Sequence, residues 1–494
     1  MTGERRYSVA MPAAVAEILT AHLDRQDGQE DVVLATYAPS TGRERTSALL
    51  RRVFLPQPGE RHVHGNASFT ADYVMRITEE AAAAGEGLVL LHSHPRGTTW
   101  QSMSTTDRAT ESGYAGLGSA ATRLPVIGMT WGGAGQVWSA RFWFSRTSVV
   151  DAESVRVVGA TFAPSFNPAL VPAPEATSAQ IRTVSAWGSA VQADLARIRV
   201  LVVGTGSVGL DVAQRLVASG IRTVGVMDFD AVEHRNLDRM IGARRQDARD
   251  QVAKVDVAAR LLRAQATAAH PDIRRHEMSI CGPDGLRVAL DYDIVFSCVD
   301  RPWPRAVLNQ IAYADLIPVI DGGINIEVAD DDTFNRATAR AHTLVPGQPC
   351  MACTRQLKPA RVALDREGLL DDPEYVRRSE IDLERAGQNV ATLSAMVSAL
   401  LLAQFVSLTV APGGRGVPGP VCYHYRPHVL EKLEDASAPS CPWETALAVG
   451  DSRIPIATGH AHAEEIVLSR HRAARTLRGR FRRLRGWLAD SYGS

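Results

Sequence analysis

Lysine is nearly absent from this chain of 494 residues, and arginine carries almost all of its positive charge. Only Lys254, Lys358 and Lys432 occur, so a lysine at a motif position is informative. Lysine and arginine together number 54, as do aspartate and glutamate, which leaves no formal net charge. This balance gives no electrostatic reason to expect nucleic-acid or membrane partners.

Cysteines and long apolar runs are also scarce. Six cysteines in so long a chain exclude the disulfide framework of a small secreted domain. We find no apolar run near the roughly 18 residues of a membrane-spanning helix. The N-terminal MTGERRYSVAMPAAVAEIL lacks the apolar segment of a signal peptide. We therefore expect a cytoplasmic protein with room for two or three domains.

The spacing of apolar residues predicts an α/β domain over residues 1–162. Helical periodicity alternates there with short strand-like runs. The expected helices and strands are 13–23, 31–37, 49–55, 70–85 and 87–95.

A second α/β domain is predicted over residues 178–450. A strand, a glycine-rich turn, a helix and a second strand follow one another there, as in a doubly wound Rossmann-like sheet. Residues 163–177 are rich in proline and alanine and form the best linker candidate. Residues 451–494 are expected to be a basic tail, in which 470–485 holds eight arginines.

Two histidines end the strand-like run of the first domain, in His92-Ser93-His94-Pro95. Alternate residues of a strand face the same side, so both imidazoles can reach one metal ion. Asp107 would supply the third ligand of a catalytic zinc site, which keeps its fourth position open. Ser104, three residues earlier, is expected to be the N-cap of the next helix.

These residues resemble the JAMM motif of the JAB/MPN metalloprotease family. The resemblance implies a mixed α/β fold and a Zn²⁺ ion on His92, His94 and Asp107. It also implies cleavage of peptide or isopeptide bonds after the C-termini of ubiquitin-like proteins. Nine residues separate His94 from Ser104, more than is common in the family, so the loop beside the metal is longer.

The resemblance also implies a glutamate that acts as general base before the first core strand. Glu30 fits this position best, and Glu44 and Glu60 are the fallbacks. Ser104 would help to bind the oxyanion.

A glycine-rich turn, Gly204-Thr205-Gly206-Ser207-Val208-Gly209, lies between the first strand and helix of the second domain. Its glycines allow backbone to approach phosphates at a helix N-terminus. Alone, this pattern is more typical of an ordinary nicotinamide enzyme. The residues that follow favour a different chemistry. They are Asp228 and Asp230 after the second strand, then Asn236 and Arg239, Lys254 on a helix, and Asp300 after the third strand.

Each of these residue types suits the adenylation of a carboxylate. An acid at the end of the second strand can hold ribose hydroxyls. Arg239 and Lys254 can neutralise triphosphate charge while a carboxylate oxygen attacks the α-phosphate. Asp300 can hold Mg²⁺, which prefers carboxylate and phosphate oxygens.

Over about residues 178–435 the order and spacing resemble the ThiF/MoeB and ubiquitin-activating family. The resemblance implies binding of ATP and Mg²⁺, with Met240 standing where the family usually has glutamine. Arg182 matches an arginine that family dimers lend to the partner's site, which implies a homodimer. The implied nucleotide and magnesium contacts are Gly204, Gly206, Gly209, Asp228, Asp230, Asn236, Arg239, Lys254 and Asp300.

The cysteines of the second domain allow three interpretations. Cys350 and Cys353 form a CxxC where many relatives have half of a structural zinc site, and Cys441-Pro442-Trp443-Glu444 stands where the other half is expected. Three thiolates and a carboxylate would then bind a second zinc. Alternatively, Cys353 resembles the thioester cysteine of ubiquitin-activating enzymes, or all three are ordinary core residues.

The combined resemblances predict a bifunctional enzyme. Its zinc domain would process or remove a ubiquitin-like carrier, and its second domain would adenylate the C-terminal tail of that carrier, for transfer here or on a conjugating enzyme. In a second interpretation the carrier is a sulfur donor in cofactor or thio-metabolite synthesis. In a third the chain is a scaffold that only binds the carrier.

Overall fold

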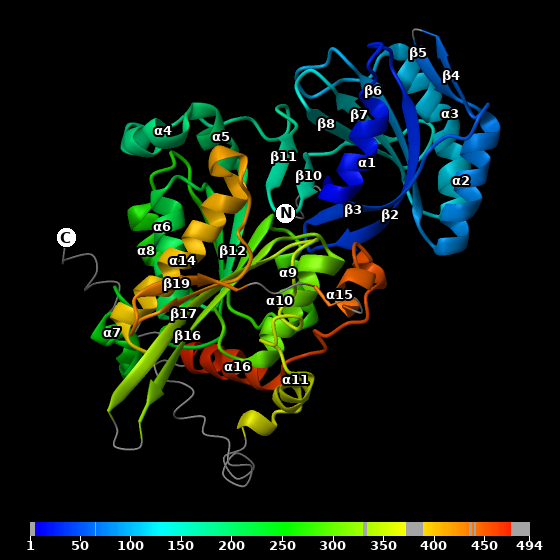
Figure 1. The fold of residues 1–494 in the computed structure, drawn as a ribbon. Helices are drawn as coiled ribbons and strands as arrows, with labels where there is room; N and C mark the ends of the chain where they lie inside the picture. Colours follow the sequence, from blue (N-terminus) through cyan, green and yellow to red (C-terminus); the bar gives the residue numbers. More distant parts are fainter. Residues whose placement is uncertain are drawn as a thin grey trace.

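The computed structural model describes residues 5–64, 66–329, 333–371, 389–433, 437–438 and 441–475. Two large sheets dominate this part of the chain, one of nine strands and one of eight. Figure 1 shows the first sheet with its helices at the upper right and the second below it. The α/β character expected of both regions is therefore present.

The first sheet lies between two layers of helix. Alternate residues of its central strand β2 enter different cores, with Val33 packing on the α1 side and Leu34 on the α2 and α3 side. The helices are α1 (Ala13–Leu23), α2 (Ala71–Ala84) and α3 (Thr105–Thr122), and β4 (Arg61–His64) with β5 (Asn66–Phe69) forms a separate hairpin. In spatial order the strands are β11 (Phe162–Phe166), β10 (Ser154–Val158), β1 (Arg6–Pro12), β3 (Arg45–Phe54), β2 (Val32–Thr41), β6 (Gly87–His94), β7 (Val126–Gly132), β8 (Val137–Trp143) and β9 (Val149–Asp151).

The boundary between the domains differs from the expected one. β11 pairs antiparallel with β10, so the first sheet extends through Phe166 into the predicted linker 163–177. The proline-rich composition of 163–177 concealed this strand. A proline can nevertheless stand in an edge strand, because the side without an N–H need not face the neighbouring strand.

The second sheet is parallel in its first five strands and antiparallel in its last three. This arrangement places the carboxyl ends of β12, β13 and β15 at one edge, where such sheets bind ligands. In spatial order the strands are β14 (Asp272–His276), β13 (Thr223–Met227), β12 (Arg199–Val203), β15 (Ile294–Ser297), β16 (Val319–Val328), β17 (Phe334–Leu344), β18 (Val421–His424) and β19 (Val429–Lys432).

Helices cover both faces of this sheet. Val200 and Val202 pack on one side with α6 (Ser207–Ala218), α8 (Lys254–Gln265) and α14 (Ala391–Thr409). Leu201 and Val203 pack on the other side with α9 (Pro283–Ala289) and α10 (Pro302–Ala314). The remaining α-helices within the described residues are α4 (Ile181–Trp187), α5 (Ser189–Arg197), α7 (Arg245–Arg249), α11 (Pro359–Arg366), α15 (Pro442–Thr445) and α16 (Ala461–Arg475).

One helix, α14, corrects the expectation that no segment is apolar enough to cross a membrane. Its 19 residues have a mean hydropathy of 1.8, which passes that test by length and composition. Val397, Leu401 and Phe405 of α14 are buried in the core of the second sheet. Three serines and one glutamine between its apolar residues hid the pattern, and α14 is a core helix of this domain.

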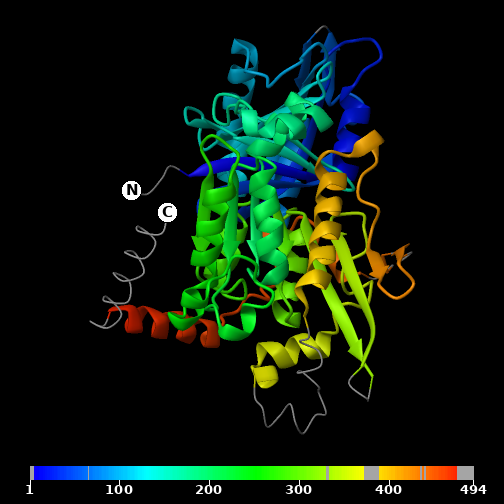
Figure 2. The ribbon, with the colours of Figure 1, turned by 90° about the vertical axis from the view of Figure 1, so that its left-hand side faces the viewer.

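The predicted tail 451–494 is described as far as Arg475, and its residues 476–494 lie outside the described part. Residues 451–475 end in α16, which packs along the second sheet at the end farthest from the first (Figures 1 and 2).

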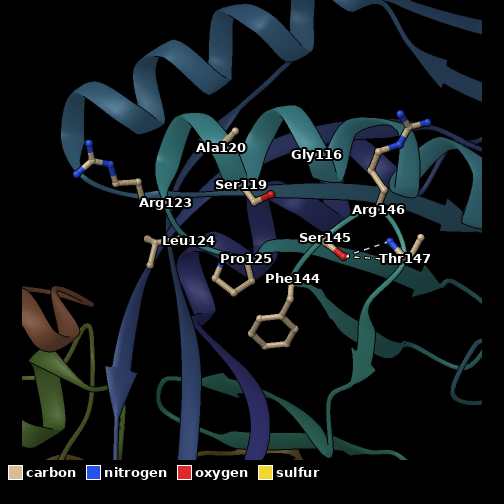
Figure 3. A pocket seen from close by; sticks show the side chains of 10 residues that line it. All are labelled: Gly116, Ser119, Ala120, Arg123, Leu124, Pro125, Phe144, Ser145, Arg146 and Thr147. Carbon is tan, nitrogen blue, oxygen red and sulfur yellow. Dashed lines mark hydrogen bonds between the residues drawn. The ribbon is translucent and has the colours of Figure 1, made fainter.

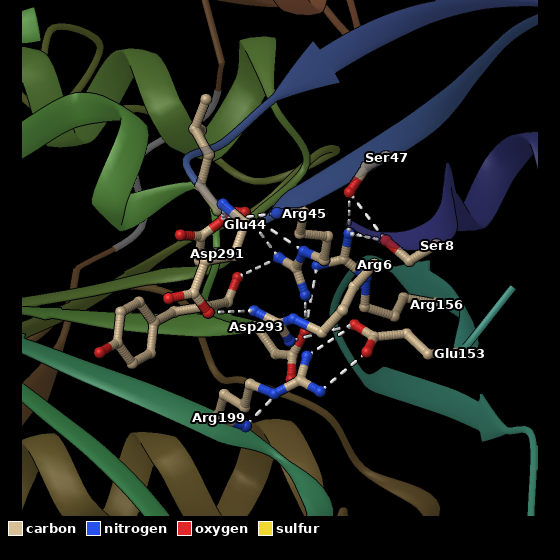
Figure 4. A network of polar contacts seen from close by, with 12 residues as sticks. Arg6, Ser8, Glu44, Arg45, Ser47, Glu153, Arg156, Arg199, Asp291 and Asp293 are labelled. Carbon is tan, nitrogen blue, oxygen red and sulfur yellow. Dashed lines mark hydrogen bonds and ion pairs between the residues drawn. The ribbon is translucent and has the colours of Figure 1, made fainter. Parts of the chain in front are cut away.

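A buried network of charges joins the two domains (Figure 4). Asp293, just before β15, pairs with Arg45 at the start of β3 and with Arg156 of β10. Glu153 binds Arg199, the first residue of β12, through both carboxylate oxygens. Because Asp293 is only 3% exposed, these pairs are shielded from solvent and fix the two sheets to one another.

Candidate functional site

The three predicted metal ligands of the first domain converge. The Nε2 atoms of His92 and His94 lie 3.2 Å apart, and the Asp107 carboxylate places Oδ1 3.7 Å from the first and Oδ2 3.8 Å from the second. His92 and His94 end β6, whereas Asp107 stands in the first turn of α3. Two imidazoles and a carboxylate within this distance are a donor set that suits zinc.

Neighbouring side chains set the orientation and charge of both imidazoles. Gln101 Oε1 lies 3.1 Å from Nδ1 of His94, which suits a proton on Nδ1 and leaves Nε2 free for a metal. Burial, with a further contribution from the charge of Arg141, lowers the pKa of His92 to about 3, so this imidazole is neutral at pH 7. Sequence reasoning missed Gln101, although the unusual length of its loop was the available signal.

Ser104 is the N-cap of α3, as expected. Its hydroxyl accepts a hydrogen bond from the backbone N–H of Asp107, and its own N–H donates to the Asp107 carboxylate. This reciprocal cap fixes the direction of Asp107. Burial opposes ionisation of Asp107, but the neighbouring His92 and the bonds from Ser104 lower its pKa below the usual value.

Of the three candidate bases, only Glu30 is placed near the ligands. It comes just before β2, where burial and the charge of Asp107 raise its pKa while His94 lowers it. A raised pKa suits a general base. Glu44 instead binds Arg274 at the domain interface, and Glu60 forms a bidentate pair with Arg76.

The glycine-rich turn of the second domain takes the form that its glycines require. Gly204 has φ +86°, and a Cβ there would lie 2.4 Å from the carbonyl oxygen of Cys298. A Cβ on Gly209 would lie 1.8 Å from the Gly204 carbonyl. Gly206 is the N-cap of α6 and supplies no side-chain cap, so the first N–H groups of that helix are available to an anionic ligand.

Asp228 organises this end of the sheet. One of its oxygens accepts hydrogen bonds from the N–H and hydroxyl of Thr205, and the other accepts from the N–H of Asp230. Burial raises the pKa of Asp228, and the positive charge of Lys254 opposes that rise. Lys254 begins α8 and its Nζ lies 2.7 Å from Asp230. An acid and an ammonium group therefore stand beside the glycine-rich turn.

The side chains of two other predicted nucleotide contacts, Arg239 and Asn236, bind their own loop in this structure. Arg239 donates to the backbone carbonyl of Arg235 and to Asp238, and the side chain of Asn236 accepts from the N–H of Glu233. Both therefore stabilise their own loop.

Asp300 and Arg182 are exposed. Asp300 follows β15 and its charge contributes to raising the pKa of Lys254, although burial of the ammonium acts in the opposite direction. A carboxylate beside a phosphate site fits Mg²⁺. Arg182 lies on α4, and among the described residues no ion pair joins it to Asp228 or Asp300.

The three cysteines converge in the second domain. The sulfur of Cys350 lies 3.6 Å from each of the sulfurs of Cys353 and Cys441. Cys350 and Cys441 are buried, and the nearby Glu444 has a buried carboxylate oxygen without a hydrogen-bond partner. The geometry is that of a metal-binding cluster, with Cys353 the most accessible of the three.

A cavity of about 550 Å³ in the first domain lies apart from all of these residues (Figure 3). It is bordered by the C-terminal half of α3 and the loop after β8, and Arg123 and Arg146 point outward from its two sides.

The zinc-type and nucleotide-type clusters lie at opposite ends of the molecule. β2 starts beside His92 and ends at Thr41, which bonds to Asp451 at the domain interface. β12 starts at the interface with Arg199 and ends at the glycine-rich turn. Since β2 alone spans about 30 Å at roughly 3.3 Å per residue, the two clusters are well separated.

Comparison with known proteins identifies the second domain. Residues 177–419 match the ThiF family. The adenylyltransferase and sulfurtransferase uba4 of Aspergillus clavatus is 34% identical over 121 residues, which are 24% of this chain and 24% of the relative. The adenylyltransferase and sulfurtransferase MOCS3 of Caenorhabditis briggsae is 30% identical over 139 residues, 28% of this chain and 34% of the relative. The matches span about a quarter to a third of these relatives.

Among solved structures, MccB of E. coli with ATP aligns over 54% of this chain and 74% of its own, with 18% identity and a TM-score of 0.41. That likeness is too low to support an inference. The family match begins at residue 177, so the JAB/MPN resemblance of the first domain rests on its motif and geometry. Residues 177–419 are a domain of the ThiF family.

Proposed function

We propose that the second domain uses ATP to adenylate the C-terminal carboxylate of a small carrier protein. The observation that carries the proposal is the joint placement of three features at the carboxyl edge of the sheet: an uncapped helix N-terminus, the acid Asp228 and the Asp230–Lys254 pair. In such a reaction a carboxylate oxygen attacks the α-phosphorus and pyrophosphate leaves, which forms an acyl adenylate.

The chain's own residues have distinct tasks in this proposal. The N–H groups at the start of α6 bind phosphate oxygens, and Lys254 stabilises negative charge that develops during the attack. Asp228 holds the glycine-rich turn and the Asp230 loop together, and it would hold the ribose hydroxyls. Asp300 would hold Mg²⁺, which neutralises phosphate charge. Arg239 must leave Arg235 to reach a phosphate.

We favour a sulfur carrier over a ubiquitin-like modifier that is conjugated to proteins. The relatives named above are called adenylyltransferases and sulfurtransferases, which supports sulfur transfer to the activated carboxylate. The test is pyrophosphate release with ATP and purified ubiquitin-fold proteins, followed by mass spectrometry of the carrier with a persulfide donor. A thiocarboxylate supports the sulfur carrier and a protein adduct supports conjugation. A chain that binds carriers but releases no pyrophosphate is a scaffold.

A second activity is proposed for the first domain, namely zinc-dependent hydrolysis of a bond at the carrier's C-terminus. The convergence of His92, His94 and Asp107 beside Glu30 favours it. Bound zinc would supply Lewis-acid chemistry, Glu30 would take a proton from the attacking water, and Ser104 would donate to the oxyanion. Cleavage of carrier fusions by the purified protein, with and without a chelator, tests this activity.

The cysteine cluster is proposed as a structural zinc site rather than a thioester centre. Two of its three sulfurs are buried, which suits a metal ligand better than a nucleophile that must meet a carrier.

The separation of the two clusters implies that a carrier leaves the zinc-type cluster before it reaches the nucleotide-type cluster of the same chain, or the reverse.

A homodimer, in which Arg182 reaches the partner's nucleotide, is also proposed. Light scattering tests the dimer, because a fully active monomer at micromolar concentration would exclude it.

A further inference from the structure

Residues 454–471, the C-terminal arm, pack along the proposed nucleotide edge of the second sheet. The arm includes most of α16 and lies beyond residue 419, where the ThiF match ends. Figures 1 and 2 show α16 at the end of this sheet that faces away from the first domain. This is the edge at which the carboxyl ends of β13, β14 and β15 lie.

The start of the arm is anchored on α10. Trp303 donates its indole N–H to the carbonyl of Ile456 at 3.0 Å, and Gln310 donates to the carbonyl of Ile454 at 2.6 Å. The N–H of Gly459 donates to the carbonyl of Cys281. Trp303 is buried and comes three residues after Asp300, so the arm is fixed beside the proposed magnesium ligand.

His460 lies between the loop that carries Asp228 and Asp230 and the first turn of α10, which follows Asp300. Its ring centroid is 5.2 Å from that of Phe229 and 5.2 Å from that of Trp303, and its Nδ1 is 2.8 Å from the hydroxyl of Ser279. Phe229 stands between Asp228 and Asp230. A single side chain of the arm therefore contacts both the Asp228–Asp230 loop and α10.

Arg470 holds the backbone of the same loop. One guanidinium nitrogen donates to the carbonyl of Phe229 at 2.7 Å, and another pairs with Glu277, which follows β14. His471 also contacts Glu277, at 2.8 Å. The Arg470 side chain is only 16% exposed, so this is a packed contact rather than a surface pair.

We propose that the C-terminal arm is part of the nucleotide-binding site, in which His460 and Arg470 are positioning residues for the loop from Asp228 to Asp230. That loop carries Asp228, the acid proposed to hold the ribose, and Asp230, the partner of Lys254. Loss of the Phe229 contact lets the loop shift, which weakens ATP binding without removing any group that touches the phosphates. The inference rests on the proposed adenylation and adds residues that the family match does not include.

The experiment measures the dissociation constant of a fluorescent ATP analogue and the thermal midpoint of the full chain. Arg470→Met should weaken binding about tenfold, the scale set by one lost charge-assisted hydrogen bond. His460→Ala should act in the same direction. Arg470→Lys should recover part of the affinity, because an ammonium group still donates to one acceptor. Arg472→Met is the matched control, since Arg472 is exposed on the same helix.

Pyrophosphate exchange adds a second readout. The Michaelis constant for ATP should rise in Arg470→Met while the maximal rate changes less, since no phosphate contact is lost. Unchanged affinity in Arg470→Met and His460→Ala would overturn the inference, as would a fall in thermal midpoint alone. If the unaltered chain itself binds no ATP, the adenylation proposal fails and this inference with it.

Discussion

The buried ion pairs between the domains allow a quantitative test, in which Asp293 is replaced by asparagine. Asp293 accepts a hydrogen bond from the backbone N–H of Arg199 and pairs with Arg45 and Arg156. Although its burial opposes ionisation, these arginines hold its pKa well below the usual range. Asp293→Asn keeps the size of the side chain but leaves the buried guanidinium groups without their counter-charge.

Breaking a buried pair by removing one partner costs about 3–5 kcal/mol. Asparagine can still accept the hydrogen bond from the N–H of Arg199, so we expect a loss at the lower end of this range, about 3 kcal/mol. That loss is a large part of the typical unfolding free energy of a domain, about 5–15 kcal/mol. Urea unfolding followed by tryptophan fluorescence measures this loss. The control is Asp284→Asn, whose exposed pair with Arg287 should contribute less than about 1 kcal/mol.

The contribution of Asp293 to stability should also depend on pH. A carboxylate with a lowered pKa in the folded state stabilises above its unfolded pKa of about 3.9, and that contribution is lost as the pH falls toward the folded value. The stability difference between Asp293 and its asparagine variant should therefore be constant near neutrality and narrow below about pH 4. A variant as stable as the unaltered protein at pH 7 would refute the structural role assigned to this network.

Three further outcomes are expected. His92→Ala should lower zinc by one ion per chain and abolish carrier hydrolysis while pyrophosphate exchange continues; unchanged zinc would remove the ligand assignment. Glu30→Gln should retain zinc while the rate of hydrolysis falls by at least about a hundredfold. Normal cleavage by this variant would exclude Glu30 as the base. In the unaltered protein the rate of hydrolysis should rise with pH through the raised pKa of Glu30. Alanine at Cys350, Cys353 or Cys441 should in each case lower both the zinc content and the thermal midpoint. If only the Cys353 variant has an effect, and that effect is loss of a reducible carrier adduct, Cys353 is a transfer cysteine.

The sequence alone determined those features that depend on short-range patterns. Periodicity located α1, α2, β2 and β6, because core-facing residues recur at the spacing of a helix or a strand. The glycine-rich turn and the Ser104 cap are local as well, since their geometry depends on a few consecutive residues. Apolar α14 was not recognised, because polar residues interrupt its run while its buried face is continuous.

Only the tertiary structure decided which distant side chains meet. It placed Glu30 near the histidines, whereas Glu44 pairs with Arg274 and Glu60 with Arg76. It turned Arg239 toward its own loop and extended the first sheet into the predicted linker. It also packed the C-terminal arm against Phe229, where Arg470 bonds to a residue more than two hundred positions earlier. Contacts across such separations depend on how sheets and helices stack, and no local pattern encodes that stacking.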